Sequence, residues 1–255
     1  MRLTIGWLVG ALVMMCGVVD ASGQIRPAPR KPRPPLQVWV AINGGYATAA
    51  GDFRDGTTFR ANGETGRFDA DYNVKAAPAL DVSGDVRVWP HLSLGVGVSR
   101  VSRSTPAAVS GSIPHPFFFN RPRSVGGEAT GLTQDERAVH VRARGTFPVG
   151  RTVASVFGGP SFIHVRQDVI RELGYSEQYP YDEATFGPDA SARADASTVG
   201  LHVGGDVAYF FTPRLGVGFG AMVTAASVDV SSASGGALRL GVGGVQAGGG
   251  LRLRF

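Results

Sequence analysis

The side chains that could perform chemistry recur at alternate positions within several short segments. Asp85 and Arg87 stand two residues apart, and Arg142 and Arg144 repeat that spacing. Successive side chains of a β-strand point to opposite faces, so residues two apart share a face. The pattern predicts charged side chains converging on one surface, where they must be paired or hydrated. The candidates are Asp81, Asp85, Arg87, His140, Arg142, Arg144, His164, Arg166, His202, Asp206, Arg252 and Arg254.

None of the sequence motifs indicates catalysis or a metal site. The five histidines are scattered along the chain, so no set of metal ligands is predicted. The carboxylate pairs Asp135–Glu136 and Asp182–Glu183 have no positioned partner. The alternating glycines at 216–220 are strand alternation, because no helix start follows them as a phosphate-binding loop requires. We therefore expect no enzyme activity and no cofactor.

Eight segments with a period of two supply the strands that position these groups. They cover residues 38–46, 80–88, 92–98, 139–147, 153–166, 199–209, 215–224 and 245–255. Short turns are predicted at 89–91, 148–150 and 212–214. Long polar loops are predicted at roughly 48–77, 104–136, 168–197 and 227–242. Short connections on one side and long ones on the other are typical of transmembrane β-barrels.

The face opposite the apolar one carries either charges or glycines. Such glycines suit a crowded barrel interior better than the wet exterior of a soluble β-sandwich. An even number of strands closed into a ring also leaves no open sheet edge, which lipid requires. A lipocalin-like soluble barrel is the alternative fold. The sequence favours the membrane barrel, with the charged face lining its lumen.

The last strand alternates to the end of the chain. Leu251, Leu253 and Phe255 share one face, and Arg252 and Arg254 share the other. This resembles the closing strand of bacterial outer-membrane β-barrels, although that family often has a second aromatic at the position of Leu253. The resemblance implies that Leu251, Leu253 and Phe255 form the signal read by the barrel-assembly machinery. Over residues 36–255 the architecture resembles the small OmpA/OmpX-type barrels, an all-β fold of eight antiparallel up-and-down transmembrane strands.

The N-terminal residues indicate export. Residues 1–23 combine an early arginine, an apolar run and small residues, which predicts a secretory signal peptide. Residues 24–35 form a basic, proline-rich periplasmic linker, and 36–255 the barrel. Cys16 lies in the signal, so the mature chain has no cysteine for thiol chemistry. The net charge of +5 is concentrated in the linker, and the nearly neutral remainder predicts no nucleic-acid binding.

The predicted lumen suggests a structural role for its charges. A salt-bridge and water network is expected from Asp81, Asp85, Arg87, Arg142, Arg144, Asp206, Arg252 and Arg254. Eight strands enclose a space that side chains just fill. With Arg166 counted, six arginines stand against three aspartates, and this excess would leave room for an anion or water at the periplasmic end.

Function is expected to reside in the long loops. Phe117, Phe118 and Phe119 are expected to tuck against the rim as part of an aromatic belt, or alternatively to contact a partner. The leading prediction is an outer-membrane protein with a structural or surface-interaction role. Its expected partners are outer-membrane lipid, the assembly machinery and an unknown extracellular ligand. The alternatives are a narrow porin-like channel and a rim enzyme that modifies lipid. His140, His164 and His202 are not followed by the His-x-Ser spacing of barrel enzymes that trim lipid A.

Overall fold

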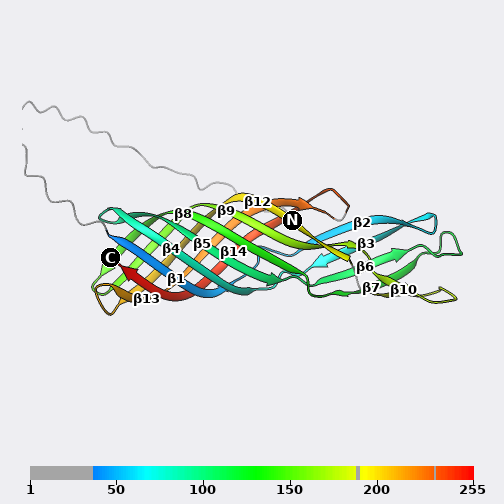
Figure 1. Ribbon diagram of the computed structural model, residues 1–255, viewed down its shortest axis with the longest axis horizontal. Helices are drawn as coiled ribbons and strands as arrows, with labels where there is room; N and C mark the ends of the chain where they lie inside the picture. The colour runs from blue at the N-terminus through cyan, green and yellow to red at the C-terminus, as the bar shows by residue number, and fades with distance from the viewer. Residues whose placement is uncertain (1–36, 188–189, 233) are drawn as a thin grey trace, which may run out of the picture. The chain divides into compact units, whose positions relative to one another are not determined.

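Eight β-strands close into one barrel (Figure 1). The structure, a computed structural model, describes residues 37–187, 190–232 and 234–255. The predicted signal peptide and linker therefore lie outside the described residues. Neighbouring strands pair antiparallel in the order β1-β14-β13-β12-β9-β8-β5-β4, and β4 returns to β1. The barrel strands are β1 (Val38–Ala47), β4 (Ala77–Trp89), β5 (Leu92–Ser104), β8 (Thr133–Val149), β9 (Thr152–Glu172), β12 (Ala190–Phe210), β13 (Leu215–Ser231) and β14 (Ala237–Arg254).

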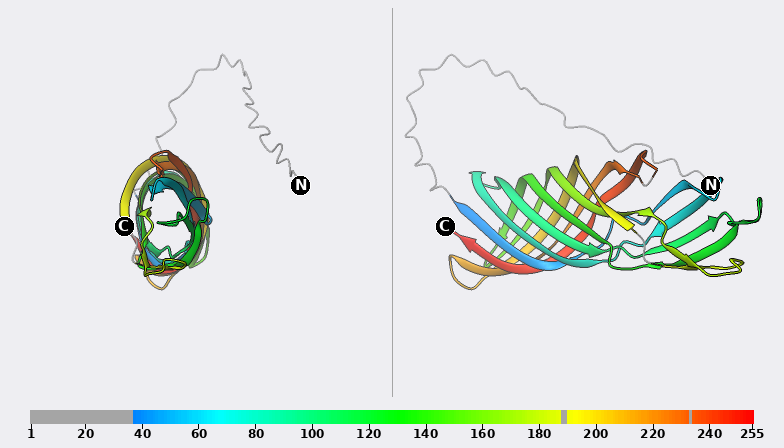
Figure 2. Two further views of the ribbon diagram at one scale, coloured as in Figure 1. Left: turned by 90° about the vertical axis from the view of Figure 1, so that its right-hand side faces the viewer. Right: turned by 45° about the vertical axis from the view of Figure 1, so that its right-hand side comes forward.

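The eight alternating segments correspond one to one with these strands, so the predicted fold class is confirmed. The three short turns connect β4 to β5, β8 to β9 and β12 to β13, all at the end we call the turn end. The terminal strand closes the ring there, because Phe255 and Val38 exchange backbone hydrogen bonds of 2.9 and 3.1 Å. Viewed along its length, the barrel is a closed oval ring (Figure 2). No helix in the described residues is long and apolar enough to cross a membrane.

The prediction of four long loops was wrong, because most of these residues are strands. β2 (Phe53–Ala61), β3 (Glu64–Tyr72), β6 (Ala107–Ile113) and β7 (Arg123–Ala129) form one four-stranded sheet. β10 (Tyr175–Glu177) and β11 (Ala184–Phe186) form a small hairpin, and β9, β12, β13 and β14 run on well beyond their predicted ends. β6 and β7 carry mainly alanine, serine and glycine, so the contrast in hydrophobicity between their two faces is weak. β3 does alternate, with Phe68, Ala70 and Tyr72 on one face and charged residues on the other, and this signal was missed.

The sheet β2-β3-β6-β7 and the long ends of β9, β12, β13 and β14 enclose an apolar core. We call this part, which lies at the end of the barrel opposite the turn end, the distal domain (Figure 1). Tyr72 of β3 is 1% exposed and its hydroxyl accepts a hydrogen bond of 2.8 Å from the backbone of Ile170 in β9. Phe53 stacks on Tyr72 with ring centroids 4.4 Å apart. The fully buried members of this core are Phe68, Ala70, Tyr72, Ala107, Ile163, Val165, Val169, Ile170, Leu240 and Val242.

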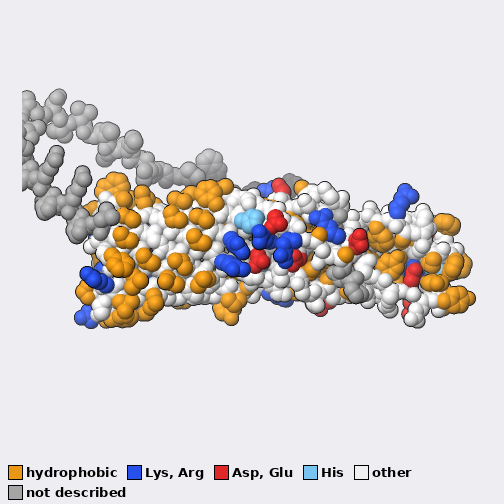
Figure 3. Space-filling view, viewed as in Figure 1, with side chains coloured by type: hydrophobic (Ala, Val, Ile, Leu, Met, Phe, Trp, Pro, Cys, Tyr) orange, Lys and Arg blue, Asp and Glu red, His pale blue; other side chains and the backbone are white. Residues whose placement is uncertain are grey.

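The outer face of the barrel proper is apolar. Leu94, Val96 and Val98 of β5 are each about half exposed, and the neighbouring strands continue the same belt around the ring. Figure 3 shows this belt over the half of the molecule nearest the turn end. A closed barrel with apolar side chains outside and charges inside is the transmembrane arrangement. The belt therefore marks the part of the barrel that lies in lipid.

Two lumen predictions on β9 were wrong. His164 and Arg166 lie on the outside, where their side chains are 41% and 44% exposed, and Ile163 and Val165 lie inside. The inward face of β9 is the one that carries Ser155 and Ser161 nearer the turn end. Beyond the apolar belt this same face becomes hydrophobic, which made it look lipid-facing in the sequence.

Candidate functional site

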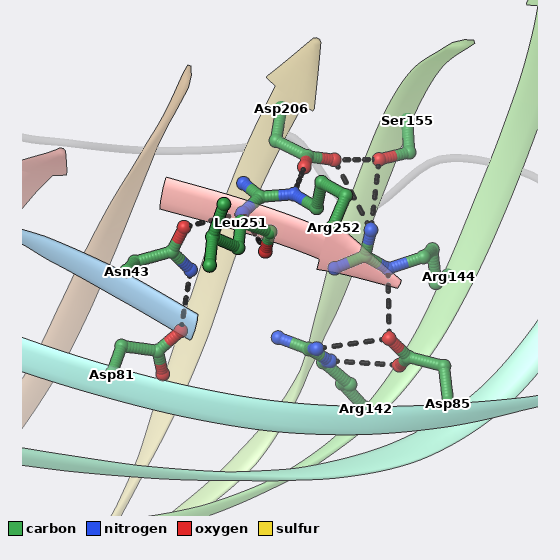
Figure 4. Close-up of polar contacts among 9 residues, drawn as sticks. All are labelled: Asn43, Asp81, Asp85, Arg142, Arg144, Ser155, Asp206, Leu251 and Arg252. Atoms are coloured by element: carbon green, nitrogen blue, oxygen red, sulfur yellow. Dashed lines mark hydrogen bonds and ion pairs between the residues drawn. The ribbon is translucent and has the colours of Figure 1, made fainter. Parts of the chain in front are cut away.

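Charged side chains from four barrel strands meet in the lumen (Figure 4). Each comes from the face opposite the apolar belt. The acids are Asp81 and Asp85 of β4 and Asp206 of β12, and the bases are Arg142 and Arg144 of β8 and Arg252 of β14. All six are less than 9% exposed. With Asn43 of β1 they form a set that we call the lumen ring.

Asp85 and Asp206 are the two centres of the ring. Arg142 makes a bidentate pair with Asp85, with both nitrogen–oxygen distances 2.9 Å. Arg144 bridges the two centres, since its Nε lies 3.3 Å from Asp85 and its Nη1 lies 3.1 Å from Asp206. Arg252 donates to Asp206 through Nε at 2.9 Å. Charge-assisted and bidentate hydrogen bonds of this kind compensate for the cost of burying the ions.

Asn43 extends the ring to β1. Arg252 donates to the Asn43 side-chain oxygen at 2.6 Å, and the Asn43 amide donates to Asp81 at 2.9 Å. The chain of contacts thus starts and ends on β4, at Asp81 and Asp85. Ser155 of β9 also contacts Asp206. The ring consequently ties together six of the eight barrel strands across the lumen.

The predicted excess of arginine is not present at this site. Arg87 and Arg254, which were predicted to join the network, lie near the turn end and make none of the ring's ion pairs. Arg254 instead stacks over Phe210, with its guanidinium carbon 4.7 Å from the ring centroid, and donates to the Pro213 carbonyl at 3.0 Å. Three arginines thus face three aspartates in the ring. The charge balance leaves no uncompensated positive charge to hold an anion there.

Glycines on the inner face make room for the ring. A Cβ atom added at Gly95 would lie 2.1 Å from a carboxylate oxygen of Asp85. At Gly218 it would lie 2.9 Å from the Arg252 Nε. The remaining cavity beside the ring is about 40 Å³, which holds only a few waters. The alternating glycines of the sequence are therefore the spaces into which neighbouring charged side chains fold.

Two further polar layers fill the lumen between the ring and the distal domain. Ser161 lies between His140 and His202, with oxygen–nitrogen distances of 2.8 and 2.9 Å, and Ser99 bonds the other nitrogen of His140 at 2.9 Å. Beyond them, the Arg103 guanidinium contacts Glu136 at 2.7 Å and the backbone carbonyl of Thr48 at 3.0 Å.

The described residues contain no group of three or more acidic, histidine or cysteine side chains that could hold a metal.

The phenylalanines that were singled out lie far from the rim. Phe117, Phe118 and Phe119 follow β6 in the turn to β7 and are 65%, 50% and 73% exposed. The expectation that they tuck into an aromatic belt was therefore wrong. Phe117 packs edge-on against Tyr181 from the β10–β11 turn at 5.4 Å, and Tyr181 packs against Tyr179. We call these five residues the aromatic tip.

Solved structures similar to this chain are outer-membrane β-barrel proteins. OprG from Pseudomonas aeruginosa is 12% identical with a TM-score of 0.46, over 86% of this chain and 95% of OprG. Neisserial surface protein A is 12% identical (TM-score 0.42, 86% and 97%), and the outer-membrane protease OmpT from Escherichia coli is 10% identical (TM-score 0.42, 86% and 97%). No protein-family model and no curated protein matches the sequence.

The sequence identities and TM-scores are too low to assign the chain to a class. The assignment rests on the closed ring of strands, the apolar belt and the charged lumen. The chain is an integral β-barrel of the outer-membrane type. Its terminal residues fit that architecture, since Phe255 and Leu251 face outward at 64% and 50% exposure. The role of Leu251, Leu253 and Phe255 as an assembly signal stays a prediction.

Sequence reasoning missed Asn43, Ser155 and Phe157 in the lumen. Asn43 and Ser155 stand at inward positions of their strands, and this parity was the available signal. Phe157 shares the face of Ile163 and Val165, which looked lipid-facing in the sequence, but the guanidinium carbons of Arg142 and Arg144 both lie 5.1 Å from its ring centroid. An aromatic side chain between two arginines gains cation–π energy in a desolvated site. Only the folded barrel reveals this contact.

Proposed function

We propose that this protein is a non-conducting outer-membrane barrel that carries an extracellular β-domain for contacts with partner proteins. The observation that carries the proposal is the aromatic tip at the end of the distal domain away from the belt. Aromatic residues and arginine dominate the energetics of protein interfaces. Here Arg121 lies 5.4 Å from the ring centroid of Phe118. A packed domain holds these side chains at a fixed place, which lowers the entropy cost of binding.

The orientation follows from the connections. Short turns face the periplasm and long connections face outward in bacterial outer-membrane barrels. The distal domain would then stand outside the cell, with the barrel as its anchor. The terminal strand would be the element that the assembly machinery recognises.

The lumen supports an anchoring role over the alternative of a channel. A conduit would need a continuous wet path, but the lumen ring, the His–Ser layer and the Arg103–Glu136 layer lie in series along the axis. The apolar core of the distal domain closes the path beyond them. Catalysis is also not proposed, because Ser161, which contacts His140, is fully buried.

Site-specific photocrosslinking on intact cells tests the proposed contact. Benzoylphenylalanine placed at Phe118 should give a discrete adduct with one protein, and the same probe at Thr58, exposed in β2 of the same domain, should not. Absence of any adduct at Phe118, or equal adducts at both positions, would contradict the proposal.

Planar-bilayer recordings of the purified barrel should show no conductance steps. Regular steps would favour the channel instead.

A further inference from the structure

A row of basic side chains crosses the outside of the barrel at the edge of the apolar belt. In the strand registers, Arg100 of β5 faces Arg137 of β8, Arg137 faces His164 of β9, and His164 faces Ser197 of β12. We call these four residues the basic row. Figure 3 shows charged side chains gathered where the belt ends. The adjacent row towards the turn end is wholly apolar and exposed and consists of Val98, Val139, Phe162 and Val199.

Two arginines of the basic row face each other without a counter-ion. Directly opposed residues on antiparallel strands have Cβ atoms about 5 Å apart, and like charges there destabilise the pair. Both Arg100 and Arg137 are exposed, and among the described residues neither guanidinium group makes a hydrogen bond or ion pair.

The neighbouring arginines are already paired. In the next rows away from the belt, Arg166 contacts Asp195 at 2.9 Å and Arg193 contacts Asp168 at 3.1 Å. Asp135 also lies in the row of Arg166. The basic row has no acidic member, so its positive charge is concentrated at the boundary with the belt.

The position of the basic row matches the level of lipid headgroups. About 40 Å of strand separates Val149 at the turn end of β8 from Arg137, at about 3.3 Å per residue. At a strand tilt of about 40° this is about 30 Å along the membrane normal. A hydrocarbon core is about 30 Å thick. With the turn end in the periplasm, Arg100 and Arg137 therefore emerge from the hydrocarbon on the outer leaflet.

We propose that Arg100 and Arg137 clamp a phosphate group on the headgroup of an outer-leaflet lipid. Guanidinium groups present a planar fork of donors that matches phosphate oxygens. A phosphate between them would neutralise the opposed charges. His164 is not counted as a donor, because its ring nitrogens face Ser197 at 3.0 Å and Asp195 at 3.7 Å. The acyl chains of the same lipid would lie along Val98, Val139 and Phe162. A free phosphate ion would use the arginines but gain nothing from this apolar row, so we assign the site to a lipid.

Lipid binding by the purified full chain in a non-ionic detergent tests this site. Diphosphoryl lipid A is titrated and the bound fraction is measured by native mass spectrometry. The double variant Arg100→Gln, Arg137→Gln should bind at least about tenfold more weakly, because two charge-assisted contacts are lost. The matched control Arg60→Gln, Arg239→Gln removes the same charge from exposed strand positions in the distal domain and should bind like the unmodified protein.

Two further arms identify the source of the phosphate. Lipid A stripped of its phosphates should bind as weakly to the unmodified protein as lipid A binds to the double variant. Inorganic phosphate at millimolar concentration should not displace lipid A. Unchanged binding by the double variant, or equal binding of the dephosphorylated lipid, would overturn the proposal. Displacement by inorganic phosphate would assign the site to a free ion and overturn the lipid assignment.

Folding is checked by heat-modifiable migration in gels. If the double variant does not fold, Arg137→Gln alone provides the same comparison: weaker binding supports the clamp, and unchanged binding overturns it. The aromatic tip is intact in all these variants. The result is therefore independent of whether the distal domain binds a partner protein.

Discussion

The interior of the barrel and the interior of the distal domain are built on opposite rules, although β9 lines both. On the inward face of β9, Ser155 and Ser161 lie among the polar side chains of the lumen, and Val165 and Val169 lie in the apolar core beyond. Its outward face changes the other way, from Phe162 in the belt to Arg166 above it. The solvent outside each part explains the difference. Lipid selects an apolar exterior and leaves polar groups for the inside, whereas water selects the reverse.

Buried side chains are stabilised in different ways in the two parts. Loss of one partner in the lumen ring leaves a buried ion unpaired, and an unpaired buried ion strongly destabilises the barrel. The distal core instead depends on volume and close packing. Single substitutions should therefore fail differently in the two parts.

The largest effect is expected for Asp206→Ala. Arg252 loses its carboxylate partner and Arg144 loses one of two, so the barrel should be destabilised by about 3–5 kcal/mol. Urea unfolding in detergent micelles measures this loss. The control Asp229→Ala, at an exposed position of β13, should stay within about 0.5 kcal/mol of the unmodified protein. Equal stability of both variants would mean that the lumen ring contributes no net pairing.

Ile170→Ala should damage the distal domain and spare the barrel. Ile170 is fully buried in the distal core, and its truncation is expected to cost about 2–5 kcal/mol there. Limited proteolysis should release distal fragments, while heat-modifiable migration of the barrel persists. Loss of both together would show that the two parts unfold as one cooperative unit and would remove the distinction between them.

The belt gives the next largest effect. Val141→Arg, near the middle of the belt on β8, should cost about 2–4 kcal/mol. The same change at Val88, next to the turn end of β4, should cost about 0–1 kcal/mol because the side chain reaches the interface. The difference between the two unfolding free energies is the test. Two equal and small costs would place both residues in water.

The smallest effect is expected for an outward ion pair. Arg166 and Asp195 are about half exposed and 2.9 Å apart, and a double-mutant cycle on them should give a coupling of about 0.2–1 kcal/mol. The same cycle on Arg142 and Asp85 inside the barrel should give several times more. Similar couplings would argue that the lumen is as well hydrated as the surface.

The sequence was sufficient for the barrel and insufficient for the distal domain, for the same physical reason. In lipid the outward face must be consistently apolar, so all eight spanning strands carry a strong period of two. β6 and β7 contain mainly serine, alanine and glycine, and the two faces of β7 hardly differ in hydrophobicity. β3 is the exception, because its alternation of Phe68, Ala70 and Tyr72 with charged residues was present in the sequence and was missed. The inversion on β9 also misled the assignment of His164 and Arg166, because parity alone does not reveal where lipid gives way to water.

The ring contacts were only partly predictable. Alternation indicated which arginines and aspartates point inward, but pairing depends on strands that meet only in the folded barrel. Asp206 and Arg252 are 46 residues apart and come from strands separated by β13. No local pattern links two such residues. Arg254 shows the converse, since it has the correct parity but lies beside Trp39 and Phe210 instead.

The contact between Asn43 and Arg252 has a consequence for how the barrel is completed. These residues belong to β1 and β14, the strands that form the seam between the two ends of the barrel. A slip of one residue at this seam would turn Arg252 toward lipid and Asn43 away from its partners. The ring of charges can thus be finished only when the seam is joined in the correct register. The lumen side chains therefore fill the barrel and also favour the correct register of β1 and β14 when the barrel closes.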